Sequence, residues 1–333
     1  MSSFDTGSLL ASIIVPVLNG GHTLDACLNS LCQQTIGPGR YEVIVVDDGS
    51  TDSSAQVAAQ HEVTLIRQDH AGAAAARNRG AQQARGSILA FTDADCEPCA
   101  DWIEQMLAPF DDPGVAGVKG AYRTRQRSLI ARFVQAEYEE KYDRLAQADW
   151  IDFVDTYAAA FRRDVFFEQG GFDPEFQLDE DQEFSFRLAR AGHAMVFAPA
   201  AVVYHLHPSG LWAYARRKVQ LGRWKVRVHL RHPAKAASDS YTPWTQKAQI
   251  ALLPLIGGLI IAAIGGLAPW AAILFAAFLG LASTVPLVLK AARHGWPVAL
   301  VAPALAFVRA GALVLGIGWG IVDLSRVVKI GPS

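Results

Sequence analysis

The chain has 333 residues, a formal net charge of −2 and a hydrophobic fraction of 51%. This length holds a catalytic domain of ordinary size together with a second region. Because the overall charge is close to zero, no basic field draws the chain to nucleic acid, and no nucleic-acid partner is expected.

The N-terminal half predicts strands that alternate with helices of about ten residues. Strands are expected at 12–17, 41–47, 63–66 and 87–92, with helices between them at 23–33, 53–60 and 72–84. This alternation predicts βαβ units, a mostly parallel sheet and the α/β fold class. Further elements are expected at 102–110 (helix), 115–122 (strand), 129–148 (amphipathic helix) and 179–191 (helix), followed by a short strand before His205.

The apolar stretch at 8–17 is expected to be the first strand and not a signal peptide. It has no basic segment before it, and Pro16 and Asn19 end the run early. The N-terminal domain is therefore expected to stay in the cytosol.

Aspartates follow two of the predicted strands, Asp47 and Asp48 after one, Asp93 and Asp95 after the other. In parallel sheets, ligands bind outside the carboxyl ends of the strands. Two carboxylates one residue apart suit a divalent cation that is held against a phosphate. No G-x-G-x-x-G follows the first strand and no G-x-x-x-x-G-K-[ST] occurs in the chain, so metal-bound carboxylates are the candidates for neutralising phosphate.

The cysteines are interpreted as incidental. Cys96 and Cys99 have the C-x-x-C spacing of redox and zinc sites, but no second cysteine pair or spaced histidine pair completes a set of four zinc ligands.

Six short motifs occur along the chain in a fixed order. They are Val15–Asn19, Val46–Asp52, Ala76–Gly80, Phe91–Asp95, Gly170–Asp173 and Glu180–Asp181. Together they resemble the motifs of family 2 glycosyltransferases, and the resemblance covers roughly residues 11 to 235. It implies a nucleotide-sugar-binding GT-A fold, which is Rossmann-like, and an inverting sugar transfer.

The resemblance also implies roles for single residues. Asp48 would hydrogen-bond the base, typically uracil, with Arg77 nearby. Asp93 would contact ribose or metal, and Asp95 would bind the Mg²⁺ or Mn²⁺ that bridges the diphosphate. Asp181 would be the catalytic base.

Other positions of the motifs are expected to line the donor and the acceptor. Pro16, Val17 and Asn19 belong to the donor-binding motif, and Glu180 stands beside the expected base on the acceptor or diphosphate side. Many members of the family have Tyr before the Asn of the first motif, whereas this chain has Leu18, so a ring that stacks on the base is missing there.

Two histidines follow the last predicted strand of this domain. His205 and His207 are two residues apart and share one face of a strand, so both could point at the diphosphate or a metal. Metal coordination by His205 and a hydrogen-bonded structural histidine are both kept as interpretations.

The segment Gln220-Leu221-Gly222-Arg223-Trp224 resembles the Gln-x-x-Arg-Trp motif of processive polysaccharide synthases. That resemblance implies that Gln220, Arg223 and Trp224 meet the leaving diphosphate and the acceptor sugar from an interfacial helix. The same segment is rich in Arg and Lys, and a basic stripe before a membrane span binds anionic headgroups. Both roles are compatible, and membrane lipids are expected partners.

The apolar C-terminal region is expected to cross a membrane. Positions 250–289 contain no charged residue, whereas one crossing needs about 20 apolar residues, so two crossings with a turn at 265–270 are predicted. The basic segment before them predicts a cytoplasmic start. The stretch 297–322 has Arg309 at its middle and Arg326 and Lys329 beyond its end, and a pair of re-entrant or interfacial helices broken near Arg309 is favoured over a third span.

These observations predict three regions. They are a cytosolic GT-A catalytic domain at 1–211, a basic interfacial segment at 212–247 and a membrane region at 248–333 with two to three transmembrane helices. A multi-pass protein of the inner (plasma) membrane is expected.

The expected activity is transfer of a sugar from a nucleotide diphosphate, with UDP favoured, to a lipid-linked or polysaccharide acceptor. Proteins of polysaccharide assembly are expected partners. A nucleotidyltransferase is the alternative enzyme, although Leu18–His22 offers no cation to grip a triphosphate. A non-catalytic membrane scaffold is the other alternative, although every acid that the chemistry needs is present.

Overall fold

The computed structural model describes residues 9–328, and the chain divides into two compact units. The first unit runs to Arg125 and resumes over Leu145–Leu206, and the second contains Gln126–Arg144 and the residues from His207 onward. The expected catalytic domain, 1–211, included residues 126–144, which the structure instead groups with the C-terminal part. Lys329, used in the membrane-topology argument, lies outside the described residues.

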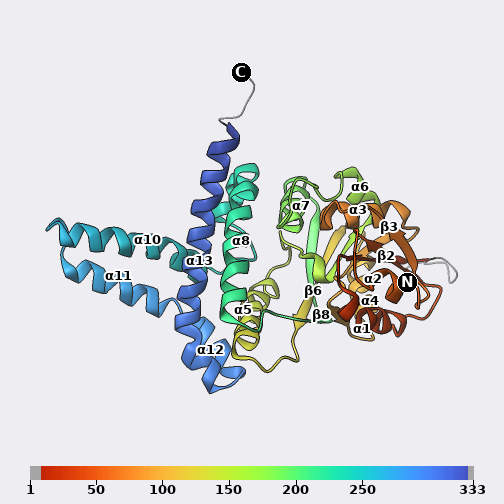
Figure 1. The fold of residues 1–333 in the computed structure, drawn as a ribbon, viewed down its shortest axis with the longest axis horizontal. Coiled ribbons are helices and arrows are strands. Elements are labelled where there is room, and N and C mark those ends of the chain that lie inside the picture. The colour runs from red at the N-terminus through yellow and green to blue at the C-terminus, as the bar shows by residue number, and fades with distance from the viewer. Residues whose placement is uncertain (1–8, 329–333) are drawn as a thin grey trace. The chain divides into compact units, whose positions relative to one another are not determined.

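The first unit is built on one eight-stranded sheet in the order β3-β2-β1-β4-β7-β6-β8-β5 (Figure 1). Its strands are β1 Ala11–Val17, β2 Tyr41–Asp47, β3 Thr64–Arg67, β4 Ile88–Phe91, β5 Cys96–Pro98, β6 Val115–Arg123, β7 Ala159–Arg162 and β8 Ala194–His205. Its helices are α1 Gly21–Cys32, α2 Ser54–Ala58, α3 Ala73–Gln83, α4 Trp102–Leu107, α6 Arg163–Glu168 and α7 Glu180–Arg190, with 3₁₀ turns at Ala108–Asp111 and Thr156–Ala158. The prediction of an α/β fold with a mostly parallel sheet is confirmed.

Strand register brings the ends of β1, β2 and β4 to one edge of the sheet. β1 pairs in parallel with β2 and with β4, and Val17 lies opposite Asp47. The three strands are buried along almost their whole length because helices such as α3 and α1 cover opposite faces of the sheet (Figure 1). The polar residues that follow each strand therefore gather at its carboxyl edge, where ligands bind in such sheets.

Two strands of the sheet were not expected from the sequence. The three-residue β5 pairs antiparallel with β8, which places Cys96 opposite His205. β7 inserts antiparallel between β4 and β6. β5 has three residues and is too short for a periodic apolar pattern, since strands are recognised over four to eight residues, and β7 with four residues is at the lower limit of that range.

A cluster of phenylalanines joins β4 and β7 to the region before α7. Phe161 and Phe172 each lie 5.1 Å from Phe184, measured between ring centroids, and Phe91 lies 5.3 Å from Phe172. All four rings are buried. Burial of large aromatic rings contributes strongly to core stability, so this cluster fixes the start of α7 relative to the strand ends.

The second unit is helical. Its helices are α5 Leu129–Leu145, α8 Leu211–Arg231, α9 Pro233–Ala237, α10 Trp244–Ile264, α11 Trp270–Ala282, α12 Val285–Arg293 and α13 Trp296–Val328. Buried side chains of α5, including Phe133 and Ala136, pack with Leu287 of α12 and with Val298 and Ala302 of α13. This apolar face explains why residues 126–144 join the C-terminal unit.

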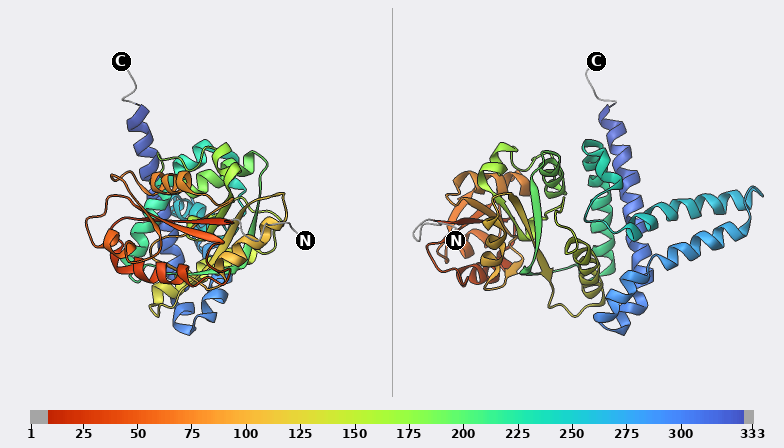
Figure 2. Two further views of the ribbon diagram at one scale, coloured as in Figure 1. Left: turned by 90° about the vertical axis from the view of Figure 1, so that its right-hand side faces the viewer. Right: turned by 180° about the vertical axis from the view of Figure 1, so that it is seen from behind.

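Helices α8 and α13 lie side by side (Figures 1 and 2). Small residues permit the close approach, because a Cβ on Gly316 would lie 2.1 Å from the Val219 carbonyl oxygen and one on Gly222 would lie 2.5 Å from the Leu313 carbonyl oxygen. Glycine at such crossings lets two helix backbones approach closely.

Within residues 9–328, three stretches of helix are long and apolar enough to span a membrane: Trp244–Ile264, Trp270–Arg293 and Trp296–Ser325. α10 and α11 form a hairpin, and the turn between Ile264 and Trp270 is where the sequence predicted it (Figure 1). Its apolar side chains are largely exposed, among them Ile264 and Leu274. A surface of this kind on so long a hairpin is typical of contact with lipid.

The predicted break near Arg309 is wrong, because α13 is one continuous helix of 33 residues. Arg309 is 1% exposed, and its guanidinium donates hydrogen bonds to Glu137 on α5 at 2.9 Å and to Gln249 on α10 at 2.8 Å. Glu137 lies 172 positions away in the chain, so local sequence gave no sign of this partner. A charge within an apolar helix is tolerated when it faces protein and is paired.

Candidate active site

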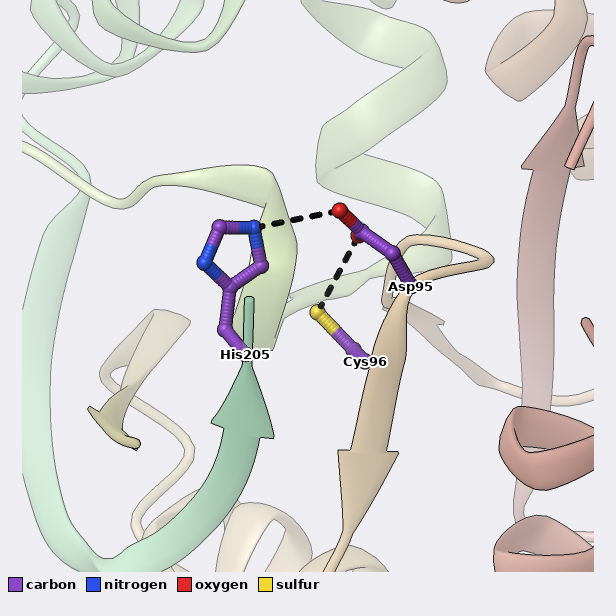
Figure 3. Close-up of side chains that lie close together, drawn as sticks. All are labelled: Asp95, Cys96 and His205. Atoms are coloured by element: carbon purple, nitrogen blue, oxygen red, sulfur yellow. Dashed lines mark hydrogen bonds and ion pairs between the residues drawn. The ribbon is translucent and has the colours of Figure 1, made fainter. Parts of the chain in front are cut away.

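The candidate site lies at the carboxyl edge of the sheet in the first unit. Asp93 and Asp95 occupy the turn between β4 and β5, and the pairing of β5 with β8 brings His205 next to them. The Nε2 atom of His205 lies 3.5 Å from Asp95 Oδ2, and the two side chains point toward one another (Figure 3). His205 is buried, whereas the Asp95 side chain is 41% exposed, so the carboxylate is open to a ligand.

Asp95, Cys96 and His205 have ligand atoms within 4.8 Å of one another, close enough to hold one metal ion. Burial, together with the charges of Asp93 and Asp95, raises the pKa of the Cys96 thiol well above its usual range, so the thiol stays protonated. Carboxylate and imidazole therefore remain as donors, and both suit Mn²⁺, while the carboxylates suit Mg²⁺. The residues present fit the divalent cation that the sequence predicted.

Arg77 of α3 links the strand tip to helix α7. Its side chain is 4% exposed, with one guanidinium nitrogen 2.7 Å from Asp93 Oδ1 and the other 2.5 Å from Glu180 Oε1. A guanidinium can bridge two carboxylates in this way because its donors form a rigid planar fork. The sequence predicted that Arg77 lies near Asp48, the candidate for binding the base of the donor. In the structure its guanidinium contacts Asp93 and Glu180.

The remaining residues of the Ala76–Gly80 motif hold α3 and the α7 region together. The Asn78 side chain donates to the Phe172 carbonyl at 2.6 Å and accepts from the Phe172 N–H at 3.0 Å. Gly80 packs on β1 so tightly that a Cβ there would lie 2.5 Å from Ile14. The Ala76–Gly80 motif therefore contacts the other two motifs, Gly170–Asp173 through Asn78 and Glu180–Asp181 through Arg77.

Asp181 is the second residue of α7. Its carboxylate accepts hydrogen bonds from the Gln182 N–H at 2.7 Å and the Thr156 N–H at 3.3 Å. Burial raises the pKa of Asp181 well above its usual range, the nearby Glu180 carboxylate adds to the rise, and Arg77 opposes it. An aspartate with a raised pKa takes a proton more readily at neutral pH, which suits a general base.

Asp48 is held by the loop between β3 and α3. It accepts hydrogen bonds from Gln68 at 2.7 Å, from the N–H groups of Ala71 and Gly72 at 2.9 Å, and it lies 2.8 Å from His70 Nδ1. Burial alone would raise the pKa of Asp48, but these hydrogen bonds outweigh it and the pKa is lowered. Asp48 is therefore ionised at neutral pH and orders the loop beside the strand ends.

The first motif forms the turn after β1. Pro16 and Val17 end the strand, and the Val17 carbonyl accepts from the Asp48 N–H at 2.9 Å. Asn19 has a φ of 54°, a conformation that Asn tolerates, and its side-chain oxygen accepts from the Thr51 N–H at 2.9 Å. Leu18, the residue before Asn19, is 46% exposed.

One ion pair near Asp181 was missed by the sequence reasoning. Lys119, in the middle of β6, is fully buried and forms an ion pair with Asp155. Asp155 precedes Thr156, the donor to Asp181, and its charge contributes to the raised pKa of Asp181. A lysine inside the apolar run Val115–Tyr122 was the available signal, since lysine is rarely buried unless it is paired.

His205 and His207 have different surroundings despite their spacing. His207 lies beyond the end of β8, in the second unit. Its backbone N–H donates to Gln126 at 2.6 Å, and its ring stacks on Tyr138 with centroids 5.5 Å apart. Among the described residues, His205 lies beside Asp95 and His207 does not, and metal binding by His205 stays a prediction.

The Gln220–Trp224 motif is part of α8 in the second unit. Arg223 forms an ion pair with Asp323 of α13, and its guanidinium lies 5.0 Å from the Trp319 ring. The guanidinium of Arg227 lies 4.8 Å from the ring of Trp224. These contacts tie the motif to the pairing of α8 with α13.

Comparison with known proteins gives consistent results. Residues 12–169 match the family Glycosyl transferase family 2. The chain is 29% identical to the pre-mycofactocin glycosyltransferase of Mycobacterium tuberculosis, covering 95% of this chain and 71% of that one. It is 28% identical to glycosyltransferase AglE of Haloferax volcanii, covering 65% of this chain and 73% of that one.

Among solved structures, the fold is similar to a mannosyltransferase from Pyrobaculum calidifontis in complex with GDP-Man and Mn²⁺. The TM-score is 0.60 at 22% identity, and the match covers 96% of this chain and 88% of that one. This is a likeness of fold, and it extends over both units.

The sheet, its acidic edge and these relatives define a nucleotide-sugar-dependent glycosyltransferase of the GT-A fold. The match to Glycosyl transferase family 2 ends at residue 169, and the apolar helices follow later in the chain.

Proposed function

We propose that the protein transfers a sugar, with inversion, from a nucleotide-diphosphate sugar to a lipid-linked or glycan acceptor. The observation that carries this proposal is the arrangement at one edge of the sheet. Arg77 joins Asp93, two residues from the Asp95–His205 pair, to Glu180, the neighbour of Asp181. A phosphate-binding group and a base are both needed for this reaction, and this edge supplies candidates for each.

We assign a separate role in the reaction to each group of residues at this edge of the sheet. Asp48 orders the loop beside the strand ends and is the candidate for contact with the base of the donor, which we take to be uracil. Asp93, Asp95 and His205 would hold Mg²⁺ or Mn²⁺, which would supply positive charge to stabilise the leaving diphosphate. Asp181 takes the proton of the acceptor hydroxyl, which is a poor nucleophile without a base.

Inversion requires the base and the leaving group on opposite faces of the sugar. Asp181 begins α7, whereas Asp95 follows β4, so the two carboxylates come from different elements of the unit. Asp181 also has its own hydrogen-bond donors, Thr156 and Gln182. This separation supports a single displacement, in which Asp181 acts as the base and Asp95 contributes to the metal site.

A membrane-bound acceptor is supported by the second unit. Its three apolar stretches are long enough to span a bilayer, and α8 before them is rich in basic residues. By the positive-inside rule such a segment favours the cytosolic side. We therefore place the reaction at the cytosolic face of the plasma membrane. The expected role of Gln220, Arg223 and Trp224 at the diphosphate stays a prediction from the sequence.

The test compares Asp181→Asn with Asp164→Asn, an exposed aspartate at the start of α6. In membranes supplied with donor and Mn²⁺, Asp181→Asn should abolish sugar transfer while donor binding, measured by calorimetry on purified protein, is retained. Asp164→Asn should behave as the wild type. Full transfer by Asp181→Asn would refute the assignment of the base.

A further inference from the structure

The second unit contains a cavity of about 520 Å³ where the end of α8, the start of α10 and the C-terminal half of α13 meet. This volume lies within the range of ligand sites, about 300–1,000 Å³. All of its lining residues belong to the second unit, so it is separate from the Asp95 and Asp181 site. We propose that this cavity binds the headgroup and the adjoining acyl chain of an anionic membrane phospholipid.

One wall of the cavity is apolar. It is formed by Ile250 of α10 and by Leu313, Ile317 and Ile321 of α13. Both helices are long and apolar enough to span a membrane. An acyl chain gains free energy with each CH₂ group that it buries against such a surface. A wall of this kind favours a hydrocarbon chain over a small soluble anion.

The opposite part of the lining is polar and carries more positive than negative charge. It includes Lys225 and His229 of α8, Lys247 of α10 and Asp239 of the preceding loop. Lys247 and Asp239 form an ion pair at 2.7 Å, and the lining contains two lysines, Lys225 and Lys247, but only one acid, Asp239. A phosphate group complements such a surface.

The surroundings of His229 agree with a positive potential there. Burial, together with the charges of Lys225 and Lys247, lowers the pKa of His229 to about 4, although Asp239 acts in the opposite direction. His229 is therefore neutral at pH 7. A neutral imidazole can still donate one hydrogen bond to a phosphate oxygen.

The two halves of the lining distinguish a phospholipid from other ligands. The apolar wall comes from membrane-span candidates, and the basic residues come from the end of α8 and the first turn of α10. Basic residues beside an apolar span attract anionic headgroups. A zwitterionic headgroup carries a balancing positive charge and gains less.

The experiment uses the purified full-length protein, stripped of lipid in a nonionic detergent and examined by native mass spectrometry. Phosphatidylglycerol, phosphatidylcholine and an isoprenoid phosphate are added separately at equal concentration, with inorganic phosphate as competitor. We expect a one-lipid adduct that forms with phosphatidylglycerol in preference to both other lipids and that resists millimolar phosphate.

Two variants test the cavity itself. Ile317→Trp fills the apolar side, and Lys225→Gln removes the cation; each should weaken phosphatidylglycerol binding by about tenfold, as expected for the loss of one charged hydrogen bond or of the space for a chain. Their controls are Leu315→Trp, at an exposed position of α13, and Arg216→Gln, an exposed cation of α8. Both controls should bind as the wild type does.

Several results would overturn the proposal. Equal binding of phosphatidylcholine would mean that no headgroup is selected. Displacement by inorganic phosphate would indicate a soluble anion site, and preference for the isoprenoid phosphate would indicate an acceptor site. Unchanged binding in Lys225→Gln, which leaves the space open, would place the lipid elsewhere even if Ile317→Trp failed to fold.

Discussion

Replacing Arg77 by Met is expected to destabilise the first unit strongly. Arg77 is 4% exposed and pairs with Asp93 at 2.7 Å and with Glu180 at 2.5 Å. Its loss leaves two carboxylates without that cation, next to the already perturbed Asp181. Removing one partner of a buried ion pair costs about 3–5 kcal/mol, because the remaining charge stays buried and uncompensated.

The matched control is Arg85→Met. Arg85 also forms an ion pair with a glutamate, Glu42, at 2.7 Å, but its side chain is 74% exposed. Exposed pairs contribute about 0–1 kcal/mol. Arg77→Lys is a second variant, and it should also be destabilised because an ammonium is a point charge without the planar fork that reaches both carboxylates.

The assay is thermal unfolding of the purified proteins in one detergent, followed by near-ultraviolet circular dichroism. For a unit of about 200 residues, each kcal/mol shifts the transition by about 2–4 °C, so Arg77→Met should unfold about 6–20 °C lower and Arg85→Met less than about 4 °C lower. Equal shifts for the two variants would refute the argument that Arg77 holds α7 to the strand tip.

Four further predictions concern Asp181, Arg309 and Gly316. Because Asp181 must be ionised to act as a base and its pKa is raised, kcat/KM should fall with decreasing pH well above the pKa of an ordinary aspartate; a pH-rate profile flat down to pH 5 would contradict this. Because the pKa of Asp181 is raised, its ionised carboxylate opposes folding at pH 8, and Asp181→Asn should be more stable than the wild type at that pH. The difference in the free energy of unfolding, measured by chemical denaturation, should shrink as the pH falls through the raised pKa. Arg309→Met should cost less than the about 3–5 kcal/mol expected for a buried carboxylate left without any cation, because Lys218 still pairs with Glu137 at 3.1 Å; a loss of more than about 5 kcal/mol would contradict this. Gly316→Ala should lower the unfolding temperature by the equivalent of about 1–3 kcal/mol, because the added methyl group overpacks against α8. Gly318 has open space around it, so Gly318→Ala should raise the unfolding temperature slightly. The opposite ranking of the two variants would contradict the close contact between α8 and α13.

The sequence predicted the first part of the fold well for a physical reason. Strands such as β2 and helices such as α3 show local patterns of apolar residues, and turn residues mark their ends, so each can be recognised within a short window. The positions of Asp48 and Asp95 at strand ends follow from those patterns. Likewise, the turn between α10 and α11 follows from the Gly and Pro residues that interrupt a long apolar run.

What escaped prediction depends on contacts between distant residues. Arg77 and Glu180 are 103 positions apart, and Arg309 and Glu137 are 172 positions apart. No periodicity indicates such partners, so Arg309 looked like a break in an apolar helix when it is a paired residue within one. The burial of Lys119 against Asp155 has the same origin, although its place in an apolar strand was a local hint.

The proposed function rests on sugar transfer from a nucleotide diphosphate, and the most direct measurement detects that reaction. Membranes that contain the protein are incubated with a panel of radiolabelled UDP- and GDP-sugars and Mn²⁺, and nucleoside diphosphate and labelled lipid or glycan are measured. The account predicts that one donor yields both products in equal amounts, and that EDTA or Asp181→Asn abolishes them. Release of pyrophosphate from a nucleoside triphosphate, or equal product with Asp181→Asn, would contradict it.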